Sequence, residues 1–589
     1  MKIDARGEAM FKKLSEVRAG EMSRRELLGK GAGLMGAAVA GAALGPAIAS
    51  AEMNPSAVRA GRLLDAKDAG TGALPNFDPP VVQVEGGKLR GFRDGKTTVF
   101  LGVVYAEAER FELPKTIKPW DGIKSAQAWG PVCPIPKMTG AGPDEFVFPH
   151  RYWIENEHCQ VLNIWTQDLS AAAKKPVMVW LHGGGFTNGS SMESYAYDGK
   201  NLSEFGDVVV VSVNHRLNIL GTLDLSAYGA AYAQSRYTGT ADLVAALQWI
   251  HNNIAQFGGD AGNVTLFGQS GGGSKGARML HTPGAKGLFH KVICESGGGE
   301  VLADQDVAKN IKTAQMIAAA TLANLNLTGD QIEKLKTVPY ADLLAAGNAA
   351  LVSVAQQTNT PRLMWNVYVD DEYITRAFCD WAAEIPLMSG SVFSEFRGNL
   401  TSGVNKNAWT QQEIDHNLTA AYGDKKVAVV AAFQQAFPGR KVQDVLFFAM
   451  PNTRALAAKR DAGKAAVYNY IFSYEYPVNG GITPFHCSEI TFVFHNLSLP
   501  PMQVATGGAP AGYALQDKVS KAWINFARTG NPSQPGLEWK PFAAGDAQTM
   551  VFDTVSECRD LHYDKLTPLL GSQAGMPTAA APSWVVKTP

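Results

Sequence analysis

The sequence predicts an α/β protein built on one large, mostly parallel β-sheet that is flanked by helices and carries helical insertions. Three observations support this fold class. Short apolar runs rich in β-branched residues recur along the chain, a helical pattern lies between two of them, and a Gly-Gln-Ser-Gly-Gly segment follows one of them directly. Strands that are covered on both faces are continuously apolar, as a parallel sheet requires.

Four runs are predicted to be central strands of the sheet. They are VLNIWT (161–166), PVMVWLHGGG (176–185), VVVVSVNHRL (208–217) and VTLFGQS (264–270). Residues 240–257 lie between the last two runs and place apolar side chains at helical spacing, so the three segments form a right-handed strand-helix-strand crossover. Nearer the N-terminus, residues 81–92 alternate around Gly86-Gly87 and predict a β-hairpin.

Ala-rich patterns predict the helical insertions, and another strand separates two of them. The helical segments are 302–360, 408–436 and 513–528, and the strand is 467–476. No internal repeat or linker interrupts residues 80–570, which we predict to be one catalytic domain. Residues 52–79 are predicted to be a linker, and the Gly/Ala/Pro-rich residues 571–589 a flexible tail.

Residues 1–51 have the pattern of a twin-arginine export signal. Arg24 and Arg25 precede a mildly apolar run, 31–51, that ends in the small residues ALGPAIASA. The run is about long enough to span a bilayer, so a membrane anchor is the alternative. Its Gly/Ala content and Pro46 favour a cleaved signal. We therefore predict a periplasmic or secreted bacterial protein that has no stable membrane insertion after signal removal.

Charge and motifs exclude several classes of partner. The formal net charge is −1 and no basic stripe is present, which argues against nucleic acid as a partner. Neither a phosphate-binding loop nor a dinucleotide fingerprint occurs, nor does the His-Glu-x-x-His zinc pattern. We predict no cofactor and no metal, and the sequence leaves the oligomeric state open.

The segment Gly268-Gln269-Ser270-Gly271-Gly272 matches the G-x-S-x-G pattern of a nucleophilic serine. Such a serine lies on a sharp turn between a strand and a helix, where flanking glycines avoid Cβ clashes. The alternative is a Gly-rich turn with a capping serine, since the chain has 60 glycines. The apolar strand before Ser270 and the helix-forming residues after it favour the nucleophile.

His182-Gly183-Gly184-Gly185-Phe186 directly follows the predicted strand VMVWL. Acyl transfer builds negative charge on the carbonyl oxygen, which preorganised backbone N–H groups can bind. Adjacent glycines let these groups point into a pocket without side chains in the way. We therefore predict that the amides of Gly184, Gly185 and Gly271 form an oxyanion hole.

Two longer blocks resemble the type-B carboxylesterases, the cholinesterase-like family. They are NEHCQVLNIW (156–165) and FGGDAGNVTLFGQSGGG (257–273), and the similarity extends from about residue 80 to 570. The resemblance implies an α/β-hydrolase fold, a Ser-Glu-His triad and a small-molecule ester substrate. Gln269 stands where the family often has Glu, which makes cationic choline-type substrates less favourable. Asn218 replaces a usual Gly.

The acid of the triad should follow Ser270 in the chain and precede the histidine. IPLMSGSVFSEF (385–396) resembles the family segment that carries this acid and identifies it as Glu395. Asp370, Asp371 and Glu372 are rival acids, although they lie ahead of the strand rather than after it.

The resemblance also identifies the base. GGITPFHCSEITFVF (480–494) is similar to the family's histidine segment, and it places His486 in a loop after the strand 467–476. A metal site formed by His486 and Glu489 is an alternative that no motif supports. The same resemblance implies a disulfide between Cys133 and Cys159.

Phe186 is the one aromatic residue that we predict to line the substrate pocket. Together these residues predict a serine carboxylesterase that forms an acyl-enzyme. Cleavage of amide, lactone, carbamate or thioester bonds by the same triad is the first alternative. A non-catalytic binding protein of the same family is the second, and the presence of Ser270, Glu395 and His486 argues against it.

Overall fold

The computed structural model describes residues 78–137, 145–400 and 404–570, all within one compact unit that extends from Thr71. The predicted export signal, the predicted tail and all but the last two residues of the predicted linker lie outside these ranges. Among the described residues, no helix combines the length and the apolarity needed to cross a membrane.

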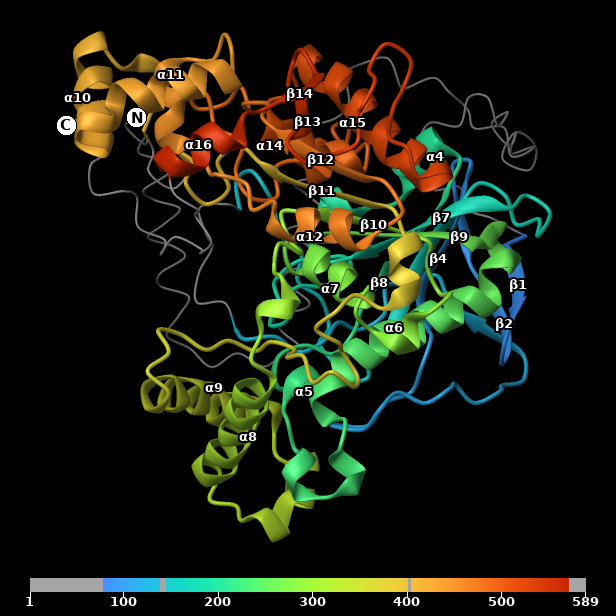
Figure 1. The fold of residues 1–589 in the computed structure, drawn as a ribbon. Coiled ribbons are helices and arrows are strands. Elements are labelled where there is room, and N and C mark those ends of the chain that lie inside the picture. Colours follow the sequence, from blue (N-terminus) through green and yellow to red (C-terminus); the bar gives the residue numbers. More distant parts are fainter. Residues whose placement is uncertain (1–77, 138–144, 401–403, 571–589) are drawn as a thin grey trace, which may run out of the picture. The chain divides into compact units, whose positions relative to one another are not determined.

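A mixed sheet forms the centre of the fold (Figure 1). In the described part of the chain it has 11 strands in the order β14-β13-β12-β11-β10-β9-β7-β8-β6-β4-β3. The strands from β13 to β8 in this order are mutually parallel. Their bounds are β7 Lys175–Leu181, β8 Val209–Val213, β9 Gly259–Gln269, β10 Lys291–Glu295, β11 Leu387–Val392, β12 Val467–Phe472 and β13 Gln548–Phe552.

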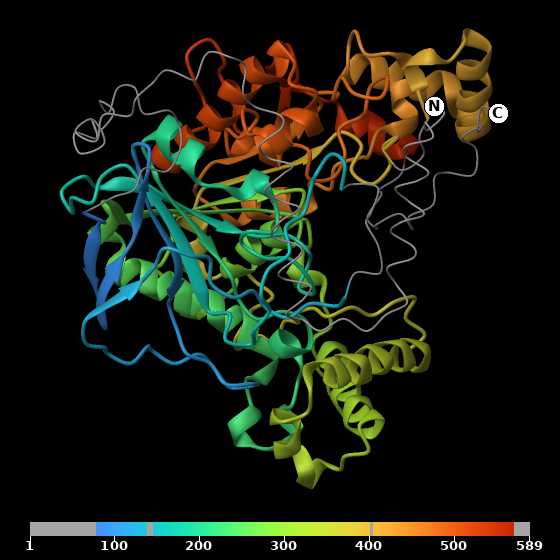
Figure 2. The same ribbon diagram turned by 180° about the vertical axis from the view of Figure 1, so that it is seen from behind.

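The antiparallel strands lie at the two ends of this sheet, and a second, smaller sheet holds the predicted hairpin. These antiparallel strands are β3 Phe92–Asp94, β4 Thr97–Val104, β6 Val161–Thr166 and β14 Glu557–Asp560. The hairpin is formed by β1 (Val81–Val84) and β2 (Gly87–Arg90), and β2 also pairs with β5 (Ile123–Ser125). Figure 2 shows this hairpin in blue.

The central strands are buried on both faces, as their composition predicts. Along β7, Val177 and Val179 pack into one hydrophobic cluster, while Met178 and Trp180 pack into another. Helix α6 (Thr238–Asn253) contributes to the first cluster and α15 (Pro510–Thr529) to the second. Because alternate side chains of a strand point to opposite faces, the sheet separates two cores.

The predicted crossover from β8 through α6 to β9 is confirmed, but β7 lies between the two strands that it connects. The strand predicted at 161–166 is also confirmed with its bounds, as β6. Its direction differs from the prediction, because β6 is antiparallel to both β8 and β4. All six residues of β6 are buried, and burial on both faces does not report strand direction.

The predicted helical segments are confirmed as separate insertions. Residues 302–360 contain α8 (Val307–Asn324) and α9 (Tyr340–Gln357), and residues 408–436 contain α10 (Gln411–Tyr422) and α11 (Lys426–Ala436). Figures 1 and 2 show the two pairs far apart from each other, α8 and α9 in yellow-green and α10 and α11 in orange. The other helices are α4 Lys200–Gly206, α5 Asn218–Thr222, α7 Gly271–Met279, α12 Arg454–Ala462, α13 Ile490–Val493, α14 Pro500–Thr506 and α16 Tyr563–Leu570.

Candidate active site

Ser270 occupies a strained turn between β9 and α7. The strand ends at Gln269 and the helix begins at Gly271. Ser270 has φ 57° and ψ −121°, a conformation that L-residues rarely adopt. Its amide donates to the Glu295 carbonyl at 2.7 Å, which fixes the turn against β10. This geometry presents the hydroxyl at the carboxyl end of the parallel strands, where α/β sheets place their ligands.

Glu395 and His486 contact each other, although 91 residues separate them in the chain. His486 Nδ1 lies 2.5 Å from Glu395 Oε2. The Val392 amide donates to the other carboxylate oxygen at 3.0 Å, and the His486 amide donates to the Glu395 carbonyl at 3.1 Å. Since an ionised carboxylate only accepts hydrogen bonds, the proton lies on Nδ1 and the lone pair on Nε2.

Two of the three rival acids are engaged in ion pairs, and no contact between Glu372 and His486 occurs among the described residues. Asp370 pairs with Arg236 at 3.0 Å, and Asp371 pairs with Arg376 at 2.7 Å. Glu489, the residue of the alternative metal site, is fully buried and accepts a hydrogen bond from the Ser296 hydroxyl at 3.4 Å. Of the carboxylates considered, Glu395 is therefore the one that binds the His486 ring.

Gln269 links the predicted nucleophile to the histidine, a contact that the sequence did not reveal. Its amide nitrogen lies 3.2 Å from His486 Nε2, and its amide oxygen accepts from the Cys487 thiol at 3.3 Å. No hydrogen bond joins Ser270 to His486 within the described residues. Catalytic hydrogen bonds are often long before substrate binds, so the separation is compatible with proton transfer in a complex.

The loop that carries Gly184 and Gly185 comes close to Gly271 at the start of α7. Gly184 and Gly185 have φ values of +78° and +64°, which turn the loop after β7 toward α7. A Cβ added at Gly271 would lie 2.5 Å from the Gly185 nitrogen, so only a glycine permits this approach. In the part of the chain that the structure describes, neither the Gly184 nor the Gly185 amide has a hydrogen-bond acceptor. These amides are free to bind a developing oxyanion.

Asn218 explains one departure from the family pattern. It has φ 47°, a region that glycine adopts freely and asparagine tolerates better than most residues. Its side-chain nitrogen donates to the carbonyls of Thr187 and Pro134 at 3.1 and 2.9 Å, and its amide donates to the Phe186 carbonyl. Asn218 thus replaces the glycine at a smaller backbone cost than most residues would, and its hydrogen bonds hold the loop that carries the predicted oxyanion donors.

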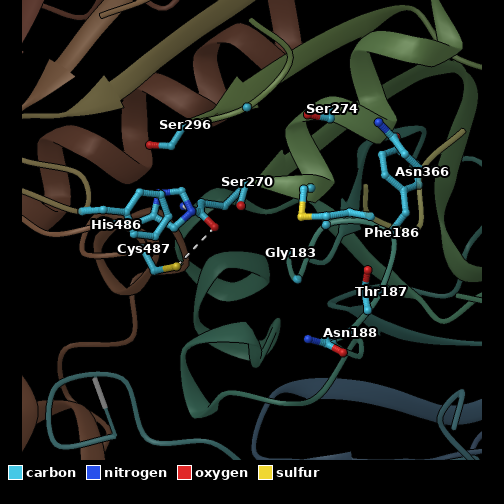
Figure 3. Close-up of a pocket in the computed structure, with 18 of the residues that line it drawn as sticks. Gly183, Phe186, Thr187, Asn188, Ser270, Ser274, Ser296, Asn366, His486 and Cys487 are labelled. Atoms are coloured by element: carbon cyan, nitrogen blue, oxygen red, sulfur yellow. Dashed lines mark hydrogen bonds between the residues drawn. The ribbon is translucent and has the colours of Figure 1, made fainter. Parts of the chain in front are cut away.

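One cavity joins these groups. It has a volume of 1550 Å³ and is lined by Ser270, Glu395, His486, the three glycines and Phe186. Figure 3 shows Ser270 between His486 and Cys487 on one side and the loop with Gly183, Phe186 and Thr187 on the other.

Insertion helix α9 supplies Asn348, Leu351 and Ala355 to the same wall, so the helical insertion helps to shape the pocket. Phe186 lies in the wall of this cavity, which is consistent with the prediction that it lines the pocket. The Arg278 guanidinium, which also lines the cavity, lies 4.7 Å from the Phe186 ring centroid.

Two features of the site carry no signal in the sequence. The Phe396 ring packs on His486 with a centroid distance of 4.2 Å. Beneath Ser270, Glu295 and Glu489 are fully buried, and burial raises the pKa of both carboxyl groups. The repulsion between them raises the pKa of Glu489 further, which favours protonated carboxyls that bring little negative charge below the nucleophile.

The predicted disulfide differs from the structure. Cys133 and Cys159 are both buried and in contact, but they are thiols. Cys133 Sγ accepts the Leu217 amide at 3.2 Å, so the sulfur is held in the site by a hydrogen bond rather than by a covalent link. Burial raises the pKa of Cys159 well above its usual value, which keeps it protonated.

Comparisons with known proteins agree with this geometry. The sequence profile of the carboxylesterase family matches residues 78–565. The para-nitrobenzyl esterase of Bacillus subtilis (strain 168) is 31% identical over 487 residues, which cover 80% of this chain and 95% of that protein.

Solved structures agree as well. An esterase from Clostridium hathewayi, described as able to hydrolyse aliphatic aromatic polyesters, is 39% identical with a TM-score of 0.76, over 84% of this chain and 98% of that one. A carboxylesterase of Geobacillus stearothermophilus is 29% identical with a TM-score of 0.64, over 83% and 99%.

Proposed function

The chain belongs to the carboxylesterase family, has its α/β-hydrolase fold and is a carboxylic ester hydrolase, and on this premise we propose that it cleaves esters through an acyl-enzyme formed on Ser270. His486 takes the serine proton as the hydroxyl attacks the ester carbonyl, and Glu395 stabilises the resulting imidazolium. The alcohol leaves with a proton from His486. Water then attacks the acyl group by the same route in reverse, so that no cofactor takes part.

The 2.5 Å contact between His486 Nδ1 and Glu395 Oε2 carries this proposal. It leaves a lone pair on Nε2, which a general base requires, and the Gln269 amide nitrogen contacts this atom at 3.2 Å. Ser270 must therefore replace Gln269 at Nε2 when the ester is bound. We assign the negative charge of the tetrahedral intermediate to the amides of Gly184, Gly185 and Gly271.

A burst experiment tests the intermediate. We expect nitrophenyl esters to release about one equivalent of nitrophenol per chain rapidly, followed by slower steady turnover, because the activated leaving group makes acylation faster than hydrolysis of the acyl-enzyme. Acid quenching in the steady phase, followed by mass spectrometry, should then find the acyl group on Ser270. An acyl group on another residue would contradict the proposal. Parallel assays compare the rates at which the protein cleaves the alternative bonds, in an amide, a lactone, a carbamate and a thioester.

Changing Gln269 to Glu should alter the pH dependence. A carboxylate within hydrogen-bond reach of His486 Nε2 favours the imidazolium, which cannot act as a base. Activity is lost as pH falls, so the acidic limb of the kcat/KM profile should move to higher pH by about one unit. Gln269→Ala, which removes the contact without adding charge, serves as the control. An unshifted limb in Gln269→Glu would contradict the contact between residue 269 and the base.

Our second proposal concerns the substrate class: we propose that the protein hydrolyses esters of aromatic and aliphatic diacids. It is supported by the 1550 Å³ cavity and by the 39% identity to the polyester-hydrolysing esterase. We expect oligomeric esters of a benzene dicarboxylic acid and a diol to be cleaved with release of acid. Hydrolysis of nitrophenyl acetate without any activity on these oligomers would limit the enzyme to small esters.

We also propose that residues 1–51 direct export by the twin-arginine pathway to the periplasm or beyond. The paired Arg24 and Arg25 and the small residues before position 52 support it. Expression in a bacterium with and without a functional twin-arginine translocase is the test. Equal export in both strains would overturn it.

A further inference from the structure

Lys275 is a buried cation that the proposed mechanism does not use. It lies in α7, five residues after Ser270, and only 1% of its surface is exposed. Lysine is almost never fully buried unless it is paired, because removing an ammonium from water is costly. The contacts of this side chain should therefore show what its burial achieves.

The Lys275 ammonium is bonded to the start of the oxyanion loop. Its Nζ donates to the His182 carbonyl at 2.9 Å. His182 follows the last residue of β7 and comes two residues before Gly184. Side chains of a helix lean toward its N-terminus, which brings Lys275 back under the turn that carries Ser270. The bond thus ties the helix after the nucleophile to the loop that holds the oxyanion donors.

The backbone around this bond is packed too closely to tolerate movement. A Cβ added at Gly272 would lie 1.9 Å from the Leu181 carbonyl oxygen and 3.0 Å from that of His182. The His182 ring is also buried, and it stacks on His215 with a centroid distance of 5.2 Å. The loop is therefore fixed at its base, and Lys275 provides a charged donor at that point.

We propose that Lys275 is a positioning residue of the oxyanion hole: its ammonium holds the His182 carbonyl, and its positive charge favours the negative tetrahedral intermediate. This inference rests on the acyl-enzyme mechanism proposed above. A charge-assisted hydrogen bond is stronger than a neutral one, and a charge in a dry interior acts over a longer distance than in water.

The charged and titratable groups that face Lys275 determine when it is charged. They are His182 and His215 on the sheet side, Glu193 near the cavity and the Cys133 thiol. Burial lowers the pKa of Lys275 to about 7, although the charge of Glu193 opposes this shift. Burial and then the Lys275 charge hold the pKa values of His182 and His215 well below their usual range, so both rings stay neutral.

The pH dependence follows from this titration. Since the pKa of Lys275 is depressed, the ammonium is present below about pH 7 and is lost as pH rises through that value. Loss of the Lys275 charge should therefore lower the kcat of the wild-type protein as pH rises above about 7.

Three variants separate the hydrogen bond from the charge. Lys275→Met removes both at nearly constant volume, and Lys275→Gln keeps a donor without charge. Lys291→Met is the matched control, because Lys291 is also buried, is bonded to Asn263 and does not line the cavity. Each variant is assayed with a nitrophenyl ester from pH 5 to 9, and thermal unfolding is measured alongside.

We expect Lys275→Met to lower kcat by about 10- to 100-fold, less than the roughly 10²- to 10³-fold loss that follows removal of an oxyanion-hole donor itself, because Lys275 acts through the His182 carbonyl. KM should change less than about threefold. The affinity for a trifluoromethyl ketone, which mimics the tetrahedral intermediate, should fall in parallel. Lys275→Gln should recover part of kcat but lose the decline of kcat at basic pH. Lys291→Met should keep the wild-type kcat and the wild-type decline at basic pH. If Lys275→Met does not fold, Lys275→Gln and its pH profile decide.

A kcat within twofold of wild type in Lys275→Met would overturn the inference, as would an equal loss in Lys291→Met or an unaltered pH profile in Lys275→Gln. The proposed mechanism has a separate readout, which is stoichiometric labelling of Ser270 in the wild-type protein by a fluorophosphonate. Labelled Ser270 together with a normal kcat in Lys275→Met rejects only the role of Lys275, whereas an unlabelled Ser270 in the active enzyme rejects the mechanism on which that role rests.

Discussion

Ser270→Ala is expected to lower kcat by about 10⁴- to 10⁶-fold, the loss that follows removal of a triad member. The substitution removes only the hydroxyl, and alanine has the same steric limits at φ 57° as serine, so the melting temperature should stay nearly unchanged. Initial rates with a nitrophenyl ester and a thermal unfolding curve measure the two effects.

Ser274→Ala is the matched control for this variant. Ser274 lies one turn further along α7, lines the same cavity and accepts the Gly298 amide at 3.1 Å. Its loss should leave kcat within about fivefold, since no reacting group depends on it. Near-normal turnover in Ser270→Ala, or an equal loss in both variants, would remove Ser270 from the mechanism.

Glu395→Gln is expected to lower kcat by about 10³- to 10⁴-fold through the wrong histidine tautomer, as amide substitutions in comparable triads do. The Val392 amide donates to Glu395 Oε1. In the variant, this donor selects the amide oxygen and turns the amide NH2 group toward His486 Nδ1. The imidazole then carries its proton on Nε2, where it cannot accept one from Ser270.

Glu300→Gln is the control, since Glu300 also lines the cavity but pairs with Arg278 at 2.8 Å. We expect its kcat to remain within about fivefold of wild type. Steady-state rates over pH 6–9 give both values. A Glu395→Gln enzyme with wild-type kcat would mean that another carboxylate orients the base.

Local patterns predicted the turn between strand and helix at Ser270 and the strand that precedes it. The apolar strand, the glycines around Ser270 and the loop from His182 all act within a few residues, and short-range steric rules govern them. The strand at 161–166 was predicted with its bounds for the same reason. Its direction was not, because direction depends on the strands β4 and β8 beside it, and their pairing is not encoded in the run itself.

The long-range parts of the site needed the family resemblance or the structure. Glu395 was identified by its segment's similarity to the family and not by spacing, since the rivals Asp370, Asp371 and Glu372 satisfy the same chain order. Gln269, Asn218 and Lys275 each gain their role from a partner that is distant or on another element: His486, the Phe186 loop and the His182 carbonyl. A single sequence does not state which polar side chains meet in the interior.

The most direct test of the central claim is to locate the covalent adduct. The protein is treated with a fluorophosphonate, digested, and mapped by mass spectrometry. We predict one adduct per chain, on Ser270 within the peptide that contains Gly268–Gly272, and none in the Ser270→Ala variant. Stoichiometric modification of any other residue, with Ser270 unlabelled, would contradict the account.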